Sequence, residues 1–172
     1  MQNLLIIEDN LIYSHFLVNS ICKELNNIRL YSIVDTGKKA LEILKKEKID
    51  IIILDLKLPD ISGIDIINYI EGNNLSQYYA SIIVLTNEID LLNQVINKKS
   101  VFTYSSKIDN INSFIDKVRE LSKEKQDISL KNSIKEKISS ELEYLGFDFS
   151  YIGTSHFTTN RPFLINFVED II

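Results

Sequence analysis

Polar side chains that could do chemistry together stand directly after short apolar segments of the chain. They are Glu8 and Asp9, Asp55, Thr86, and Lys107. If these side chains meet, the three carboxylates repel one another unless a cation lies among them. Oxygen ligands without Cys or His favour a hard metal, Mg²⁺ or Mn²⁺. A carboxylate beside such a cation, an ammonium group and a hydroxyl would accept a phosphoryl group, so phosphoryl transfer to Asp55 is the expected chemistry.

The elements that must bring these residues together alternate between strands and helices. Short apolar segments predict strands at residues 4–7, 28–34, 49–54, 81–85 and 101–105. Helical periodicity predicts helices at residues 11–25, 38–48, 64–70, 89–96 and 111–121. This (βα)5 pattern predicts an α/β fold with a doubly wound, five-stranded parallel sheet of the flavodoxin-like type, with helices on both faces. Right-handed crossovers then bring the C-terminal ends of the strands, and the polar side chains after them, to one edge.

The segment at residues 49–54 is expected to be the central strand, because its apolar run is nearly continuous and would be buried on both faces of the sheet. Pro59, Asp60 and Gly63 follow Asp55 with residues typical of turns. In the first predicted helix, the apolar side chains expected on one side are Leu11, Phe16, Leu17, Ile21 and Leu25.

Composition and charge exclude several classes of protein. The formal net charge of −5 argues against a broad nucleic-acid or anionic-membrane surface. No apolar run approaches the roughly 20 residues that span a bilayer. The first ten residues, MQNLLIIEDN, lack the basic segment of a secretory signal. The single Cys22 excludes an internal disulfide and a cysteine-based zinc site. We therefore expect a cytoplasmic protein that is not attached to a membrane.

The residues at the predicted edge resemble the receiver domain of two-component response regulators, CheY-like, from Met1 to about Leu121. The resemblance rests on Glu8-Asp9, on Asp55 followed by LPDISG, on Thr86, and on Tyr104 and Lys107. It implies that Asp55 is the phosphoacceptor. It also implies that Mg²⁺ is held by Glu8, Asp9, Asp55 and the backbone carbonyl of Lys57.

The same resemblance implies a switch and a partner. Thr86 and Tyr104 would form the switch pair, and Lys107 would bind the phosphoryl group. A sensor histidine kinase or a phosphotransfer protein would donate it, and the fourth helix, fifth strand and fifth helix would change shape and pair two chains into a homodimer. The protein would then be a phosphoacceptor regulator and not an enzyme, with at most Mg²⁺-dependent self-phosphorylation and autodephosphorylation.

The sequence departs from the receiver pattern at two positions. Receivers usually carry proline, in a cis peptide, after the lysine, whereas Ile108 follows Lys107. A cis bond before a non-proline residue costs about 3 kcal/mol, so the sequence favours a trans peptide and a less rigidly placed Lys107. Asn87 replaces the usual small residue after Thr86 and would crowd the phosphoryl group or hydrogen-bond to it. Lys57 and Glu88 are positioned to pair across the entrance and to tune the lifetime of the phosphoryl group.

Other functions are possible for a strand-end aspartate. A haloacid-dehalogenase-type phosphatase would need a second Asp two residues on, where Lys57 stands. A flavodoxin-like FMN binder would need a phosphate-binding loop after the first strand, where Glu8 and Asp9 would repel phosphate. The main alternative is a degenerate receiver that serves as a phosphorylation-independent docking or dimerisation module.

The chain is expected to divide into a receiver domain at residues 1–122, a linker or exposed helical turn at residues 123–127, and a small, mostly helical segment at residues 128–172. Residues 125–172 carry 5 Lys/Arg and 7 Asp/Glu, a net charge of −2 that does not suit DNA binding. The apolar stripe of the predicted helix consists of Leu130, Ile134, Ile138, Leu142 and Leu145.

Two interpretations of this segment remain open. The pattern Ile138, Leu142, Leu145-Gly146-Phe147, Tyr151-Ile152-Gly153 resembles the start of the DNA-binding domain of the sporulation-initiation regulators over about 30 residues. The segment would then be a truncated or degenerate output domain for transcription regulation, binding DNA only if complete. In the rival interpretation, the apolar stripe and the aromatic residues form a self-association or partner-docking module.

Overall fold

The computed structural model describes residues 1–73, 81–107, 109–144, 149–152 and 156–159. The chain divides into two compact units, Met1–Ser122 and Lys123–Ile172. Within the described residues, no helix is both long enough and apolar enough to cross a membrane.

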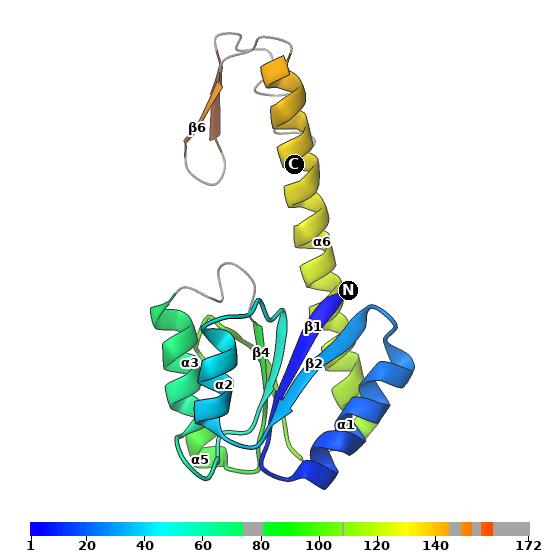
Figure 1. Ribbon diagram of the computed structural model, residues 1–172, viewed down its shortest axis with the longest axis vertical. Coiled ribbons are helices and arrows are strands. Elements are labelled where there is room, and N and C mark those ends of the chain that lie inside the picture. The colour runs from blue at the N-terminus through cyan, green and yellow to red at the C-terminus, as the bar shows by residue number, and fades with distance from the viewer. Residues whose placement is uncertain (74–80, 108, 145–148, 153–155, 160–172) are drawn as a thin grey trace. The chain divides into compact units, whose positions relative to one another are not determined.

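The first unit is built on a five-stranded parallel sheet in the order β2-β1-β3-β4-β5 (Figure 1). The strands are β1 (Gln2–Ile7), β2 (Ile28–Val34), β3 (Ile51–Leu54), β4 (Ser81–Leu85) and β5 (Val101–Ser105). All four residues of β3 are buried, as expected for a strand covered on both faces. The predicted doubly wound α/β fold is therefore confirmed.

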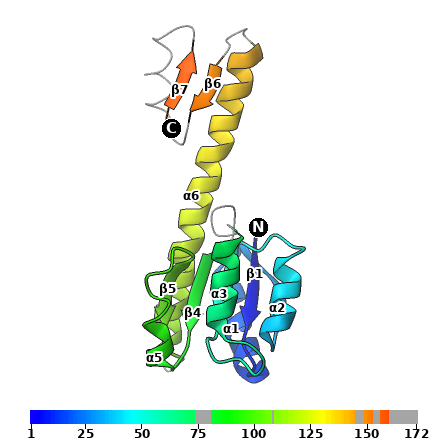
Figure 2. The ribbon, with the colours of Figure 1, turned by 90° about the vertical axis from the view of Figure 1, so that its left-hand side faces the viewer.

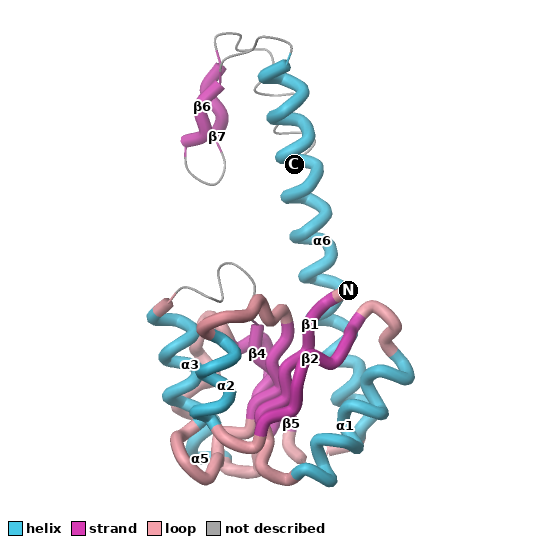
Figure 3. The backbone as a smooth tube through the Cα atoms, viewed as in Figure 1, coloured by secondary structure: helices cyan, strands magenta, loops and turns pink. Residues whose placement is uncertain are grey.

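Helices cover both faces of this sheet (Figures 2 and 3). On one face, α1 (Leu11–Glu24) and the first part of α6 (Ile111–Tyr144) bury residues such as Leu17, Ile21 and Val118 against β1, β3 and β4. On the other face, α2 (Gly37–Leu44), α3 (Gly63–Gly72) and α5 (Ile89–Leu92) form a second apolar core. These two cores hold the C-terminal ends of the strands in a fixed arrangement.

The loop after β3 is anchored by Asp60. Its carboxylate accepts hydrogen bonds from the backbone N–H groups of Gly37 at 2.8 Å and Lys38 at 2.9 Å. Thr36, the N-cap residue of α2, makes no capping bond with its own side chain. Asp60 therefore caps α2 from a distance and ties the segment that follows Asp55 to a neighbouring helix.

The apolar side expected for α1 was wrong at two of its five residues. Leu11 and Phe16 remain 52% and 49% exposed, whereas Leu17, Ile21 and Leu25 are buried. Ser14 and Leu17, on either side of Phe16 in the sequence, are fully buried. Phe16 is exposed because, at 3.6 residues per turn, it lies on the opposite side of the helix from Ile21 and Leu25.

The predicted fourth helix is shorter than expected. It covers only Ile89–Leu92, and hydrogen bonds from Gln94 to Leu91 and from Val95 to Leu92 then form tighter turns. Asparagine and β-branched residues, which have low helix propensity, follow Leu92 and explain the early end.

Residues 123–127, expected to be a linker or an exposed helical turn, lie inside α6 and are largely exposed. The Lys, Glu and Gln residues among them are good helix formers, and no Gly or Pro stands between Gly72 and Gly146. The polar composition marks an exposed helical segment and not a break.

The second unit contains the rest of α6 and an antiparallel hairpin of β6 (Phe149–Ile152) and β7 (His156–Thr159). The hairpin was not predicted, since the segment was expected to be mostly helical. Leu130 and Ile134 of the expected apolar stripe are 61% and 38% exposed. Leu145, Gly146, Phe147 and Gly153 lie outside the described residues, and the domain limits stay a prediction.

Gly63 provides a test of how tightly the site is packed. A Cβ atom there would lie 2.6 Å from the backbone carbonyl oxygen of Asp55 and 2.8 Å from Cα of Leu56. Because backbone atoms cannot move aside as a side chain can, Gly63→Ala is expected to lower the free energy of unfolding by about 1–3 kcal/mol.

The matched control is Gly72→Ala, where a Cβ would meet nothing within 4 Å. This change should leave the free energy of unfolding unchanged or raise it by up to about 1 kcal/mol. Urea unfolding of the two variants measures the difference, and equal effects would contradict the packing argument.

Candidate functional site

Two buried carboxylates lie side by side where β1 and β3 end. The ladder hydrogen bonds continue into both residues, with the Glu8 N–H donating to Val34 O at 3.0 Å and the Asp55 N–H donating to Ile7 O at 2.9 Å. The two residues are 1% and 4% exposed. In the order β2-β1-β3-β4-β5, β1 and β3 flank the point where the strand order reverses, which is where α/β sheets bind ligands.

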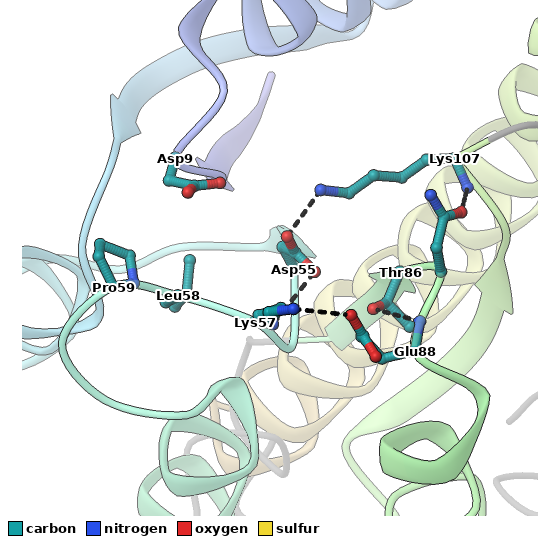
Figure 4. Close-up of a pocket in the computed structure, with 9 residues that line it drawn as sticks. Asp9, Asp55, Lys57, Leu58, Pro59, Thr86, Glu88 and Lys107 are labelled. Carbon is teal, nitrogen blue, oxygen red and sulfur yellow. Dashed lines mark hydrogen bonds and ion pairs between the residues drawn. The ribbon is translucent and has the colours of Figure 1, made fainter.

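Lys107, after β5, reaches both carboxylates. Its Nζ lies 2.6 Å from Oδ2 of Asp55 and 2.7 Å from Oε2 of Glu8 (Figure 4 shows the Asp55 contact). Burial alone lowers the pKa of the Lys107 ammonium, but its hydrogen bonds to Asp55 and Glu8 outweigh burial and raise the pKa above its usual 10.5. The ammonium therefore remains charged at neutral pH and balances part of the buried negative charge.

The three predicted carboxylates form one cluster that suits a hard cation. One ligand atom from each of Glu8, Asp9 and Asp55 lies within 4.8 Å of the others. Oε2 of Glu8 is buried and lies 2.7 Å from the Lys107 ammonium, which also contacts Asp55. An all-oxygen donor set with more carboxylate charge than one ammonium group balances fits Mg²⁺ or Mn²⁺.

A pocket of about 350 Å³ opens beside Asp55 (Figure 4). The residues that line it are Asp9, Asp55, Lys57, Leu58, Pro59, Thr86, Asn87, Glu88 and Lys107. Thr86 is buried, and its Oγ1 accepts a hydrogen bond from the Glu88 N–H at 3.2 Å. The pocket thus brings together segments that are far apart in the sequence.

The predicted pairing of Lys57 with Glu88 is present. Lys57 Nζ lies 3.1 Å from Oε1 of Glu88, and both side chains line the pocket (Figure 4). The Lys57 N–H also donates to Oδ1 of Asp55 at 3.2 Å. The loop after β3 is therefore linked both to Asp55 and to the segment after β4.

Tyr104, predicted as half of the switch pair, does not line the pocket. Its side chain is 43% exposed. Lys117 on α6 donates to the Tyr104 carbonyl oxygen at 2.7 Å, and its Nζ lies 5.9 Å from the centroid of the Tyr104 ring. This contact accompanies the outward position of the ring and was not predicted from the sequence.

Asn87 lines the pocket, and the expectation that it crowds the phosphoryl group or hydrogen-bonds to it stays a prediction. Its Oδ1 accepts hydrogen bonds from Ser106 Oγ at 3.0 Å and from the Lys107 N–H at 3.1 Å. Asn87 therefore holds the segment that carries Lys107. The peptide at Ile108, for which a trans bond was expected, lies outside the described residues.

Tyr13 is a further residue at the site that the sequence did not single out. Its hydroxyl donates to the Lys107 carbonyl oxygen at 3.3 Å, across 94 positions of sequence. Its place in the helical pattern of residues 11–25 gave no sign of this contact, because the partner is a backbone atom of a distant loop.

Comparison with known proteins identifies relatives of the first unit. A family model for the response regulator receiver domain matches residues 4–120. Comparison with curated proteins gives no significant match.

Solved structures share the fold of this region. The signal receiver domain assigned to a Luxo repressor protein of Vibrio parahaemolyticus is 26% identical, with a TM-score of 0.65, over 75% of this chain and 95% of that chain. The response regulator TrrA of Thermotoga maritima, in complex with Mg²⁺ and BeF, is 23% identical, with a TM-score of 0.60, over 70% and 99% of the chains. A CheY-like receiver domain protein of Methanospirillum hungatei is 19% identical, with a TM-score of 0.62, over 74% and 98%.

The buried position of Glu8 predicts a pH-dependent stability. Burial raises the pKa of Glu8 above 4.5 even though Lys107 lowers it. The folded protein therefore binds this proton more tightly than the unfolded chain, and ionised Glu8 destabilises the fold as pH rises through the raised pKa. Without metal, Glu8→Gln should raise the free energy of unfolding at about pH 7 and leave it nearly unchanged at about pH 4, where Glu8 is protonated in both states.

Urea unfolding in the presence of a chelator measures this effect, with Glu42→Gln on the exposed side of α2 as control. A loss of stability in Glu8→Gln at neutral pH would show the opposite, that the ion pair with Lys107 outweighs the burial of the charge.

Proposed function

The chain belongs to the response regulator receiver domain family, and on that premise we propose that Asp55 accepts a phosphoryl group from a sensor histidine kinase or a phosphotransfer protein. Members of this family are phosphoacceptors of two-component signalling. The observation that carries the proposal is the buried Asp55 carboxylate at the floor of a pocket, with the Lys107 ammonium 2.6 Å from one of its oxygens.

Receiver domains bind Mg²⁺ at an acidic pocket, and the cluster of this chain offers the same chemistry. We assign Glu8, Asp9, Asp55 and the backbone carbonyl of Lys57 as its ligands, with Mn²⁺ as a substitute for Mg²⁺. Bound there, the ion would supply positive charge that offsets the charge on the phosphoryl oxygens. The complex of TrrA with Mg²⁺ and BeF, a relative in fold, supports this assignment.

The transfer uses groups already in place around Asp55. A carboxylate oxygen of Asp55 forms a bond to phosphorus while the bond from phosphorus to the donor's nitrogen breaks, leaving an acyl-phosphate on Asp55. The Lys107 ammonium pairs with one phosphoryl oxygen, and the Thr86 hydroxyl donates to another. Transfer would replace the 2.6 Å contact between Lys107 and Asp55 with contacts to the new group.

Exposed apolar residues beside the site support a protein donor. Leu11, Ile12 and Phe16, in the first turns of α1, are 52%, 85% and 49% exposed. Since α1 begins two residues after Asp9, these side chains lie close to the entrance of the acidic cluster. A helical donor protein could bury them as it presents its phosphohistidine.

The proposed output follows from movement of Thr86 toward the phosphoryl group. Tyr104 would turn inward to fill the vacated space, changing the surface of α5, β5 and the first part of α6. That face would pair two chains into a homodimer. We further propose transcription regulation as the output, with residues 1–122 as the receiver and residues 128–172 as a truncated or degenerate output domain that binds DNA only if complete.

Intact-mass spectrometry after incubation with a small acyl-phosphate donor and Mg²⁺ tests the proposal. The wild-type protein should gain about 80 Da, the mass of HPO₃, as expected for acyl-phosphate formation on a carboxylate. Asp55→Asn should gain nothing, and the control Asp65→Asn, on the exposed side of α3, should react like the wild type. A wild-type protein that takes no phosphoryl group and binds no beryllofluoride would instead be a phosphorylation-independent docking module.

The ion pair of Lys57 and Glu88 is proposed to prolong the phosphoryl lifetime by restricting access of water to the pocket. Because an exposed pair contributes about 0–1 kcal/mol, Lys57→Gln, Glu88→Gln and the double variant should each hydrolyse the acyl-phosphate up to about fivefold faster. If the pair acts as a unit, the double variant should be no faster than either single one.

Lys39→Gln is the matched control, since it breaks an exposed ion pair with Asp35 on α2 without touching the pocket. Loss of the phosphoryl mass over time measures the lifetime. Unchanged lifetimes in all three site variants would reject the role of the pair.

A further inference from the structure

The backbone of Lys107 is held from two sides by side chains of other segments. On its amide side, Asn87 Oδ1 accepts from the Lys107 N–H at 3.1 Å and from Ser106 Oγ at 3.0 Å. On its carbonyl side, the Tyr13 hydroxyl donates to Lys107 O at 3.3 Å. The two contacts fix both peptide groups of the residue whose ammonium reaches Asp55.

Tyr13 is tied back to the acidic cluster through the start of α1. Its own N–H donates to Oδ1 of Asn10, the N-cap of the helix, at 3.0 Å. The Asn10 N–H in turn donates to Oε1 of Glu8 at 3.2 Å. Lys107 Nζ also donates to this same oxygen, Oε1 of Glu8, at 2.9 Å. The contacts therefore form a closed circuit through Lys107, Tyr13, Asn10 and Glu8.

The ring of Tyr13 adds a second contact with the same lysine. Lys107 Nζ lies 5.9 Å from the centroid of the Tyr13 ring, within the range of cation–π attraction. Phe16 stacks on Tyr13 with 6.2 Å between ring centroids. Burial and the nearby charge of Glu8 raise the pKa of Tyr13, so its hydroxyl keeps the proton that it donates.

A lysine side chain needs such support to stay directed at one carboxylate. It carries about 2 kcal/mol of rotamer entropy, and Ile108 gives its backbone no proline ring to restrict it. Side-chain tethers from α1 and from the segment after β4 can supply that restriction.

We propose that Tyr13 is a positioning residue that keeps the Lys107 ammonium directed at Asp55 through its hydroxyl and its ring. The inference rests on the proposed function in so far as it concerns phosphoryl transfer. The positioning of Lys107 by Tyr13 does not require that Asp55 is phosphorylated.

The first test compares Tyr13→Phe, which loses only the hydroxyl, with Tyr31→Phe. Tyr31 lies on β2, away from the site, and its hydroxyl is hydrogen-bonded to Glu47. Loss of one hydrogen bond should slow acyl-phosphate formation about three- to tenfold in Tyr13→Phe, with no change in Tyr31→Phe. In a Lys107→Ala background, Tyr13→Phe should have no further effect, because Tyr13 acts through that lysine. An equal loss in both backgrounds would mean that Tyr13 is merely structural and would overturn the inference.

The second test does not depend on phosphorylation. A small amine-acetylating reagent modifies exposed lysines, and peptide mass spectrometry gives the rate at Lys107. That rate should rise about three- to tenfold in Tyr13→Phe, since the ammonium spends more time away from its carboxylate partners, while the rate at Lys39 stays constant. An unchanged rate at Lys107 would overturn the inference. If wild-type protein forms no acyl-phosphate, the proposed function fails, and the acetylation rates alone decide the role of Tyr13.

Discussion

The structure of the site depends on one ammonium group that contacts two buried carboxylates and offsets part of their charge. Asp55 and Glu8 end adjacent strands and are almost fully buried, and ionised groups in such a place strongly destabilise a fold when they have no partner. Lys107 is the basic side chain that contacts both. The balance is incomplete, since one ammonium group faces two carboxylates, and burial raises the pKa of Glu8. The site is thus held with a surplus of negative charge, which is the state that a hard cation would stabilise.

The sheet explains why a lysine occupies this position. Lys107 follows β5, and β4 lies between β5 and β3, so the backbones that carry Lys107 and Asp55 are two strand spacings, about 10 Å, apart. The four-carbon stem of lysine and the Asp55 side chain together close this gap, with 2.6 Å between Nζ and Oδ2, and Thr86 follows the intervening strand β4. Asn87 and Tyr13 then fix the backbone of Lys107 by hydrogen bonds to its N–H and its carbonyl oxygen. The pocket beside Asp55 is therefore lined by both a hydroxyl and an ammonium group.

The same contacts suggest how the site communicates with the surface of the molecule. The segment after β5 carries Lys107, and β5 itself carries Tyr104, whose carbonyl and ring both contact Lys117 on α6. In the proposed switch, a change in the contacts of Lys107 or Thr86 would reach the exposed Tyr104 ring through a few residues. The position of that ring depends on an ammonium–carbonyl hydrogen bond and a cation–π contact, which are weak enough to be exchanged.

The sequence by itself determined the parallel sheet, the strand ends and the meeting of Glu8, Asp9, Asp55, Thr86 and Lys107, because hydrophobic periodicity and crossover handedness are local or general rules. It also predicted the pairing of Lys57 with Glu88. Only the tertiary structure decided which apolar residues of α1 are covered, where the helix after β4 ends, and that α6 continues through residues 123–127. The roles of Tyr13, Asn87 and Lys117 belong to this second group. Each contacts a backbone atom of a distant segment. Because every residue type carries the same backbone groups, the sequence does not indicate which of them a side chain will contact.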